Sequence, residues 1–160
     1  MEILYIIWSH LKLRNILGEL KQKNMDFKEP KLSLKDIVSD QKLLDSCEIE
    51  FNNTRYWNAV LNALRHLEVR VREKSGLNFT GFNLISRAFD KDHGKLDILA
   101  SQDQEEKEGF KLIMMGVMKF HRNQKAHNEG ELTIETAYQI IGYVDYLLKI
   151  VDQSKLVSKQ

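Results

Sequence analysis

Three polar residues that follow an apolar stretch have the side chains needed to cleave a phosphodiester bond. Arg122, Asn123 and His127 stand at the end of the segment 109–127. An imidazole with an ordinary pKa of about 6.5 can accept the proton of a ribose 2′-hydroxyl near neutral pH, and a guanidinium offers a fork of donors to a phosphate. Asn123 could orient the imidazole or the ribose. This chemistry needs no metal ion and no organic cofactor.

Two lysines and a second histidine lie close to these residues. Lys119 and Lys125 could attract the phosphates of an RNA backbone, and dimerisation would double that patch. His121 could donate a proton to the leaving oxygen, although its place on the apolar side of the segment favours packing. A simpler interpretation of the whole group is that cations at the end of a helix interact with the helix dipole and the last carbonyls. The spacing alone favours this second interpretation.

The segment that carries these residues has the pattern of an amphipathic helix. Its apolar positions recur three and four residues apart, at Phe110, Ile113, Met114, Val117 and Met118. On a regular helix Arg122 and His127 would lie about 140° apart, whereas Asn123 and His127 would share a side. The catalytic hypothesis therefore expects the helix to unwind near 126–128.

Helical patterns also dominate the rest of the chain, and none of it shows strand-like alternation of useful length. We expect helices at about 2–24, from Ser33 to Leu44, at 54–75, from Thr80 to Phe89, from Ser101 onward and at 133–153, with loops at 24–33, 46–53 and 96–100. The predicted fold class is all-α. Residues 54–153 would form an up-and-down four-helix bundle, preceded by two additional N-terminal helices.

The last predicted helix carries two apolar stripes instead of one. The second stripe consists of Ile140, Tyr143, Leu147 and Ile150. A helix that is apolar on both sides must be covered on both sides. It lies either in the middle of the bundle or against a second subunit.

Length and composition limit the possible classes of protein. The chain has 160 residues, 42% of them hydrophobic, and a net charge of +1, which lacks the basic excess of an unspecific nucleic-acid coat. We expect an N-terminal helical extension at 1–50 and one bundle domain at 51–160. The single cysteine, Cys47, excludes an intramolecular disulfide and a cysteine-built zinc site. No apolar run has membrane-spanning length, so we expect a soluble cytoplasmic protein. No set of histidine, aspartate and glutamate residues has the spacing of metal ligands, so we expect no metal site.

Three stretches give the chain a resemblance to a known family. They read LRHLEVRVRE from Leu64, GFNLISRAFD from Gly81 and GFKLIMMGVMKFHRNQKAH from Gly109. In this order they resemble the Ymh family of uncharacterised prokaryotic proteins, within the HEPN superfamily of all-helical domains. The resemblance covers about residues 56–152, and residues 1–50 have no counterpart in it.

The resemblance implies a HEPN-like bundle and a metal-independent endoribonuclease. Arg122, Asn123 and His127 match the active-site pattern, which in that superfamily lies at the cleft between two subunits. The implied partners are RNA, a second copy of the chain and an antitoxin protein, since such proteins often act as toxins or in phage defence. The pattern has a proline where this chain has Gln124. The alternative is a non-catalytic helical module that dimerises, or binds a protein or nucleotide, through the second stripe of the last helix.

Overall fold

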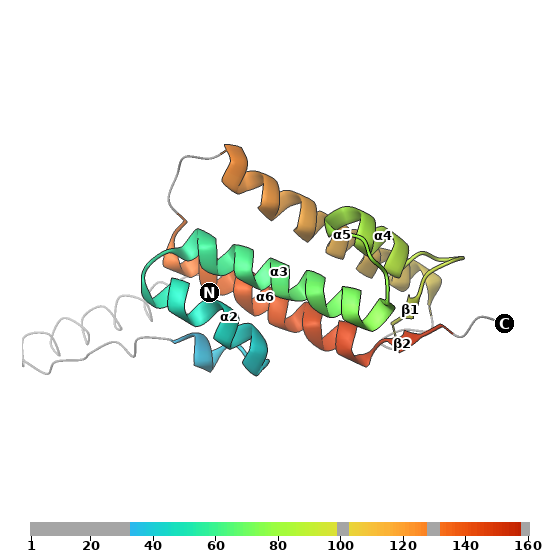
Figure 1. Cartoon of the computed structure of the whole chain (residues 1–160), viewed down its shortest axis with the longest axis horizontal. Coiled ribbons are helices and arrows are strands. Elements are labelled where there is room, and N and C mark those ends of the chain that lie inside the picture. Colours follow the sequence, from blue (N-terminus) through green and yellow to red (C-terminus); the bar gives the residue numbers. More distant parts are fainter. Residues whose placement is uncertain (1–32, 99–102, 128–131, 158–160) are drawn as a thin grey trace, which may run out of the picture. The chain divides into compact units, whose positions relative to one another are not determined.

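The computed structural model describes residues 33–98, 103–127 and 132–157, and for 122–127 it describes the backbone alone. These residues form an all-α bundle, which confirms the predicted fold class (Figure 1). The predicted helix at 2–24, the loop at 24–33 up to residue 32, and the helix start predicted at Ser101 lie outside the described residues.

The predicted helix from Ser33 to Leu44 is divided into two elements. Ser33 begins a short 3₁₀-helix, η1 (Leu34–Asp36), and its backbone N–H donates to the Asp36 carboxylate at 2.6 Å. The next helix, α2 (Gln41–Asn52), begins at Asp40, whose carboxylate accepts from the Leu43 N–H at 2.8 Å. The prediction of a loop at 46–53 is wrong. The α2 helix continues there because its buried side chains keep a helical spacing, at Leu43, Leu44, Cys47 and Phe51.

Each of the other described α-helices contacts α3 (Tyr56–Ser75). This helix packs against α2 and α6 and also touches α4 and α5. Its buried side has the helical spacing expected of the helix predicted at 54–75, at Val60, Leu64, Leu67 and Val71. The helix begins two residues later than predicted, at Tyr56, and ends as predicted at Ser75. The following residue, Gly76, has a φ of 69°, which side chains disfavour.

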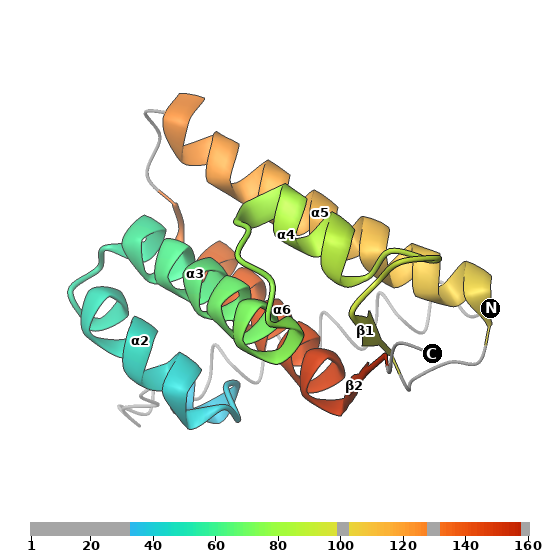
Figure 2. The same ribbon diagram turned by 45° about the vertical axis from the view of Figure 1, so that its right-hand side comes forward.

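A short helix and a small strand pair follow. The α4 helix (Gly81–Ala88) lies along α5, as Figure 2 shows. The predicted loop at 96–100 begins as a strand, since β1 (Leu96–Asp97) pairs antiparallel with β2 (Lys155–Leu156). Two residues are too short to produce a recognisable alternation, and their partner lies about sixty positions further along the chain. The sequence therefore gave no local signal of this pair.

The last two helices complete the bundle. In both views α5 (Gln104–His127) extends past the end of α4, and α6 (Ile134–Gln153) runs beside α3 (Figures 1 and 2). The second stripe of α6 is mostly covered within the chain, since Ile140 and Leu147 are buried. Tyr143 is 40% exposed and stacks on Tyr146, with ring centroids 6.0 Å apart. Tyr143 is therefore the member of that stripe that a partner could contact.

Candidate functional site

The three predicted catalytic residues lie in the last two turns of α5. The helix is continuous to His127, so the unwinding expected near 126–128 does not occur at Ala126 or His127. In a regular helix the positions of Arg122 and His127 are about 140° apart around the axis, and their Cα atoms are about 8–9 Å apart. The positions of Asn123 and His127 are only about 40° apart. The backbone thus brings Asn123 and His127 to one side and places Arg122 on another.

The residues just before this end of α5 differ in burial. Met114 and Met118 are buried, as expected of core residues, whereas Lys119 and Phe120 are exposed. His121 is partly buried and packs edge-on against Phe120, with ring centroids 5.0 Å apart. This packing agrees with the structural role expected for His121. Lys119 is open to solvent, where it can meet a phosphate.

A second group of ionisable residues, which the sequence did not reveal, connects α2 and α3. Arg70 donates to the carboxylates of Asp40 at 2.8 Å and Asp152 at 2.5 Å, and the Nε2 atom of His66 lies 3.5 Å from Asp40 Oδ1. Burial lowers the pKa of His66, so its ring is neutral at pH 7. Burial alone would raise the pKa of Asp40, but the Leu43 N–H and then Arg70 outweigh it and lower that pKa. The i, i+4 spacing of His66 and Arg70 was the signal that could have found this group.

A shallow cavity of about 320 Å³ lies beside His66, lined by Ser46, Asn62, Arg65, His66 and Val69. The Asn62 amide donates to the Ser46 carbonyl at 2.9 Å. Asp40 is already engaged by Leu43 and Arg70, so it is not a strong base toward anything in the cavity. The group serves mainly to fasten the start of α2 to α3 and to the end of α6.

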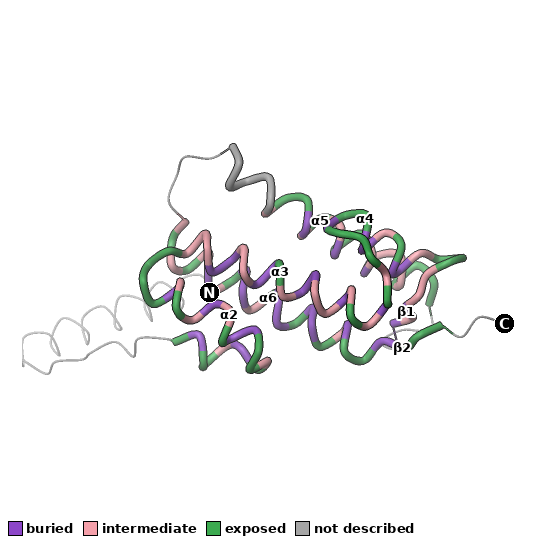
Figure 3. Tube along the Cα trace, in the orientation of Figure 1, coloured by how far each residue is buried: buried purple, intermediate pink, exposed green. Residues whose placement is uncertain are grey.

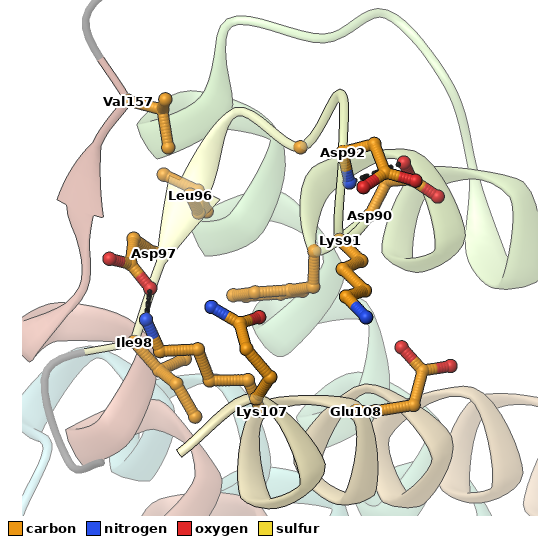
Figure 4. A pocket seen from close by; sticks show the side chains of 12 residues that line it. Asp90, Lys91, Asp92, Leu96, Asp97, Ile98, Lys107, Glu108 and Val157 are labelled. Atoms are coloured by element: carbon orange, nitrogen blue, oxygen red, sulfur yellow. Dashed lines mark hydrogen bonds and ion pairs between the residues drawn. The ribbon is translucent and has the colours of Figure 1, made fainter. Parts of the chain in front are cut away.

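A cavity of about 220 Å³ lies where the loop after α4 meets β1 and the start of α5 (Figure 4). Phe89, Leu96 and Ile98, all nearly fully buried, supply its apolar lining. At its rim Lys107 pairs with Asp97 at 2.6 Å. Backbone N–H groups of His93 and Asp92 lower the pKa of Asp90, which lies 3.7 Å from Lys111. Charges of both signs are thus largely paired around this cavity.

The described residues show neither of two features that would indicate other functions. Among them no group of three or more histidine, cysteine, aspartate or glutamate residues could hold a metal ion. Within the same ranges no helix is long and apolar enough to cross a membrane.

Comparison with known proteins identifies a family. The sequence profile of a family described as "Protein of unknown function (Hypoth_ymh)" matches residues 38–151. No curated protein and no solved structure matches the chain. The match extends from α2 to residue 151 of α6, so it leaves out η1, the last two residues of α6 and β2. On this match the chain belongs to the Ymh family, whose function is unknown.

Proposed function

We propose that this chain is a metal-independent endoribonuclease of the HEPN type, in which Arg122 binds the phosphate and His127 is the general base. Asn123 orients His127, and Lys119 and Lys125 attract the RNA backbone. The observation that supports this proposal best is that one continuous helix carries all five residues within about 12 Å along its axis. Asn123 and His127 share one side of this helix, so one nucleotide of an RNA could contact both.

The reaction needs only groups that these side chains provide. His127 takes the proton of the 2′-hydroxyl, and the 2′-oxygen forms a bond to phosphorus as the bond to the 5′-oxygen breaks. The departing 5′-oxygen then receives a proton. The products are a 2′,3′-cyclic phosphate and a 5′-hydroxyl. Arg122 donates hydrogen bonds to the phosphate oxygens, whose charge grows in the transition state.

The regular geometry of α5 sets a condition on this mechanism. Arg122 and His127 can hold one phosphate between them only if the guanidinium turns toward the end of the helix, because their positions are about 140° apart. A proline at position 124 would break the hydrogen bonding of that last turn and disfavour helix at the preceding residue. We therefore expect Gln124→Pro to bring the two side chains closer and to increase cleavage.

The test is cleavage of a mixed-sequence single-stranded RNA by the full chain in the presence of a metal chelator. We expect products with cyclic phosphate ends, and at least a hundred-fold slower cleavage by His127→Ala and by Arg122→Ala. Lys149→Ala, a change of an exposed lysine on α6, is the matched control and should cleave normally. Undiminished cleavage by both α5 variants, with normal circular dichroism, would contradict the proposal.

A second candidate function is a non-catalytic helical module that assembles with a partner. It is favoured by the separation of Arg122 and His127 on a regular helix and by the exposed Tyr143 and Tyr146 of α6. This candidate predicts that Tyr143→Asp disrupts assembly and that His127→Ala leaves every RNA intact. Leu147 cannot serve in this test, because it is buried and its replacement by Asp would unfold the bundle.

In biological terms we propose a toxin or phage-defence effector that acts as a homodimer and is regulated by an antitoxin protein. A cell that makes an active ribonuclease of this kind should grow poorly. Expression of the wild-type chain in bacteria should therefore slow growth, and expression of His127→Ala should not. Equal growth with both chains would argue against a toxin.

A further inference from the structure

The corner between α3 and α4 exposes two phenylalanines and an arginine. Phe79 and Phe82 are 37% and 45% exposed and lie outside the hydrophobic core. The guanidinium of Arg87, which is also exposed, lies over the Phe79 ring, 4.4 Å from its centroid. Figure 3 shows that the loop before α4 consists largely of exposed residues. Two aromatic rings that add little to the core, with a cation beside them, are typical of a binding surface.

This corner is held in a fixed conformation by a buried carboxylate. Glu68 of α3 is 6% exposed and accepts from the Gly81 N–H at 3.0 Å and from Arg72 at 2.5 Å. The Nε atom of Arg72 in turn donates to the Phe79 carbonyl oxygen at 3.2 Å. Gly81 has a φ of 53°, a conformation that favours glycine. The loop is therefore ordered before any ligand arrives, which lowers the entropic cost of binding.

The charge of Arg87 is available to a ligand. Among the described residues no carboxylate pairs with it, in contrast to Arg70 and Arg72 of α3. Because the guanidinium already rests on the Phe79 ring, it loses little further freedom when it donates to an anion. A guanidinium held in this way suits a phosphate, to which it can donate two hydrogen bonds.

The exposed ring of Phe82 and the charge of Arg87 together fit a nucleotide. An unpaired base has a flat face that stacks on an aromatic side chain, and the phosphate beside it carries negative charge. A purely apolar partner would leave Arg87 without a counter-charge, and a purely acidic partner would leave the rings uncovered. We propose that Phe82 stacks on an unpaired base of single-stranded RNA and that Arg87 binds an adjacent phosphate.

The corner lies within reach of an RNA strand that is bound at the end of α5. The α4 and α5 helices run in opposite directions, and Phe89, just after α4, packs against Phe110 with ring centroids 5.3 Å apart (Figures 1 and 2). Phe82 is therefore about level with position 117 of α5, and about 15 Å of helix separate that level from His127. A few nucleotides can span this distance. The choice of RNA as ligand rests on the proposed function, and the stacking site adds a place where the strand is held.

The first test measures binding of a fluorescently labelled single-stranded RNA to the full chain, by anisotropy at several salt concentrations. The 2′-hydroxyls of this RNA are methylated, so that the 2′-oxygen cannot attack. Phe82→Ala should weaken binding roughly ten- to hundred-fold, the effect of losing one stacked base, without changing the salt dependence. Arg87→Ala should also weaken binding, and the slope of log Kd against log salt should fall by about 0.7, because one phosphate contact is lost.

Ile49→Ala is the matched control, because it shortens an exposed apolar side chain on α2 and should bind the RNA as the wild type does. A duplex of the same sequence has no unpaired bases, so Phe82→Ala should not change its binding. Wild-type affinity for the single strand in both Phe82→Ala and Arg87→Ala would overturn the proposal, as would a wild-type chain that does not bind the RNA.

The second test detects the stacking itself and keeps an aromatic ring at position 82, so that the fold is preserved. Phe82→Trp adds an exposed indole to a chain with two tryptophans, and a stacked base should quench its fluorescence. The methylated RNA should therefore quench this variant clearly more than the wild type, and equal quenching would overturn the proposal. Stacking at Phe82 without cleavage of unmethylated RNA would contradict only the ribonuclease. Cleavage with unaltered affinity in Phe82→Ala would contradict only this site.

Discussion

Asp145 offers the sharpest test of what holds the bundle together. This residue of α6 is 2% exposed, and its carboxylate accepts from the backbone N–H groups of Ser39 at 3.0 Å and Asp40 at 2.9 Å. The Ser39 hydroxyl donates to it at 3.0 Å, and Lys149 lies 2.9 Å away. One carboxylate thus satisfies the donors at the start of α2.

Replacement of Asp145 by Asn keeps the shape of the side chain but removes its charge and one acceptor. Both backbone N–H groups donate to Oδ1, so the amide of Asn either keeps them on its oxygen and turns its NH₂ group toward the Lys149 ammonium and the Ser39 hydroxyl, or turns its NH₂ group toward both backbone donors. An unsatisfied donor costs roughly 1–3 kcal/mol, and a hydrogen bond to a charged acceptor is worth more than one to a neutral acceptor. The pair with the exposed Lys149 adds little. We expect Asp145→Asn to lower the free energy of unfolding by about 2–3 kcal/mol and the melting temperature by roughly 10 °C.

The measurement is urea and thermal unfolding followed by circular dichroism. Asp45→Asn is the matched control, because Asp45 is exposed and accepts one bond from Gln41 of its own helix. It should change the stability by less than about 0.5 kcal/mol. A loss below about 1 kcal/mol in Asp145→Asn, or a loss equal to that of the control, would refute the role assigned to this carboxylate.

The same carboxylate makes a prediction about pH. Burial alone would raise the pKa of Asp145, but Lys149 and then the Asp40 and Ser39 donors outweigh burial and lower it below the ordinary value of 3.8. Because the pKa of Asp145 is lower in the folded than in the unfolded state, the ionised carboxylate adds to the free energy of unfolding above pH 3.8. This contribution is lost as the pH falls through the pKa of the folded state. The difference between wild type and Asp145→Asn should therefore be constant from pH 7 to pH 5 and shrink below about pH 4. A difference that stays unchanged at pH 3 would contradict this.

Two further predictions concern a glycine and the cysteine. Gly94→Ala should destabilise the protein by roughly 2 kcal/mol or more, because the added Cβ would overlap the Asp90 carbonyl oxygen and crowd the Ala88 carbonyl oxygen. Gly116→Ala should be neutral or stabilising, because its Cβ would meet nothing within 4 Å. Urea unfolding measures both effects. Burial raises the pKa of Cys47 to about 11, so a disulfide reagent at pH 8 should modify this thiol only as fast as the protein opens. Rapid modification of the folded protein would contradict the burial of Cys47.

The sequence predicted the long helices because each carries apolar residues with helical spacing. The helix predicted at 54–75 corresponds to α3, where Val60, Leu64, Leu67 and Val71 are buried, and the helix predicted at 133–153 corresponds to α6. The wrong predictions from the sequence have physical reasons. The polar residues 46–53 suggested a loop, but Cys47 and Phe51 continue the buried side of α2. The pair of β1 and β2 depends on contact between distant residues, which local patterns do not contain.

For the candidate site, the sequence predicted the residue types and their place at the end of a helix, but not the contacts between distant residues. The sequence placed Arg122, Asn123 and His127 at the end of a helix, and the backbone of α5 agrees. It could not show that Asp145 would accept from the Ser39 and Asp40 backbone N–H groups at the start of α2, since these contacts join residues about a hundred positions apart. The sequence also did not predict that Phe120 is exposed, because an apolar residue in an amphipathic helix is expected to be buried.

The small strand pair has a practical consequence for anyone who shortens this protein. Leu96 pairs with Leu156, and this bond closes a loop of about sixty residues that contains both α5 and α6. The family match ends at residue 151, before β2 begins. A chain shortened to the residues of the family match would therefore lack β2 and its pairing with β1. Its last two helices would be held to the rest of the bundle by fewer contacts, and proteases would digest them more easily.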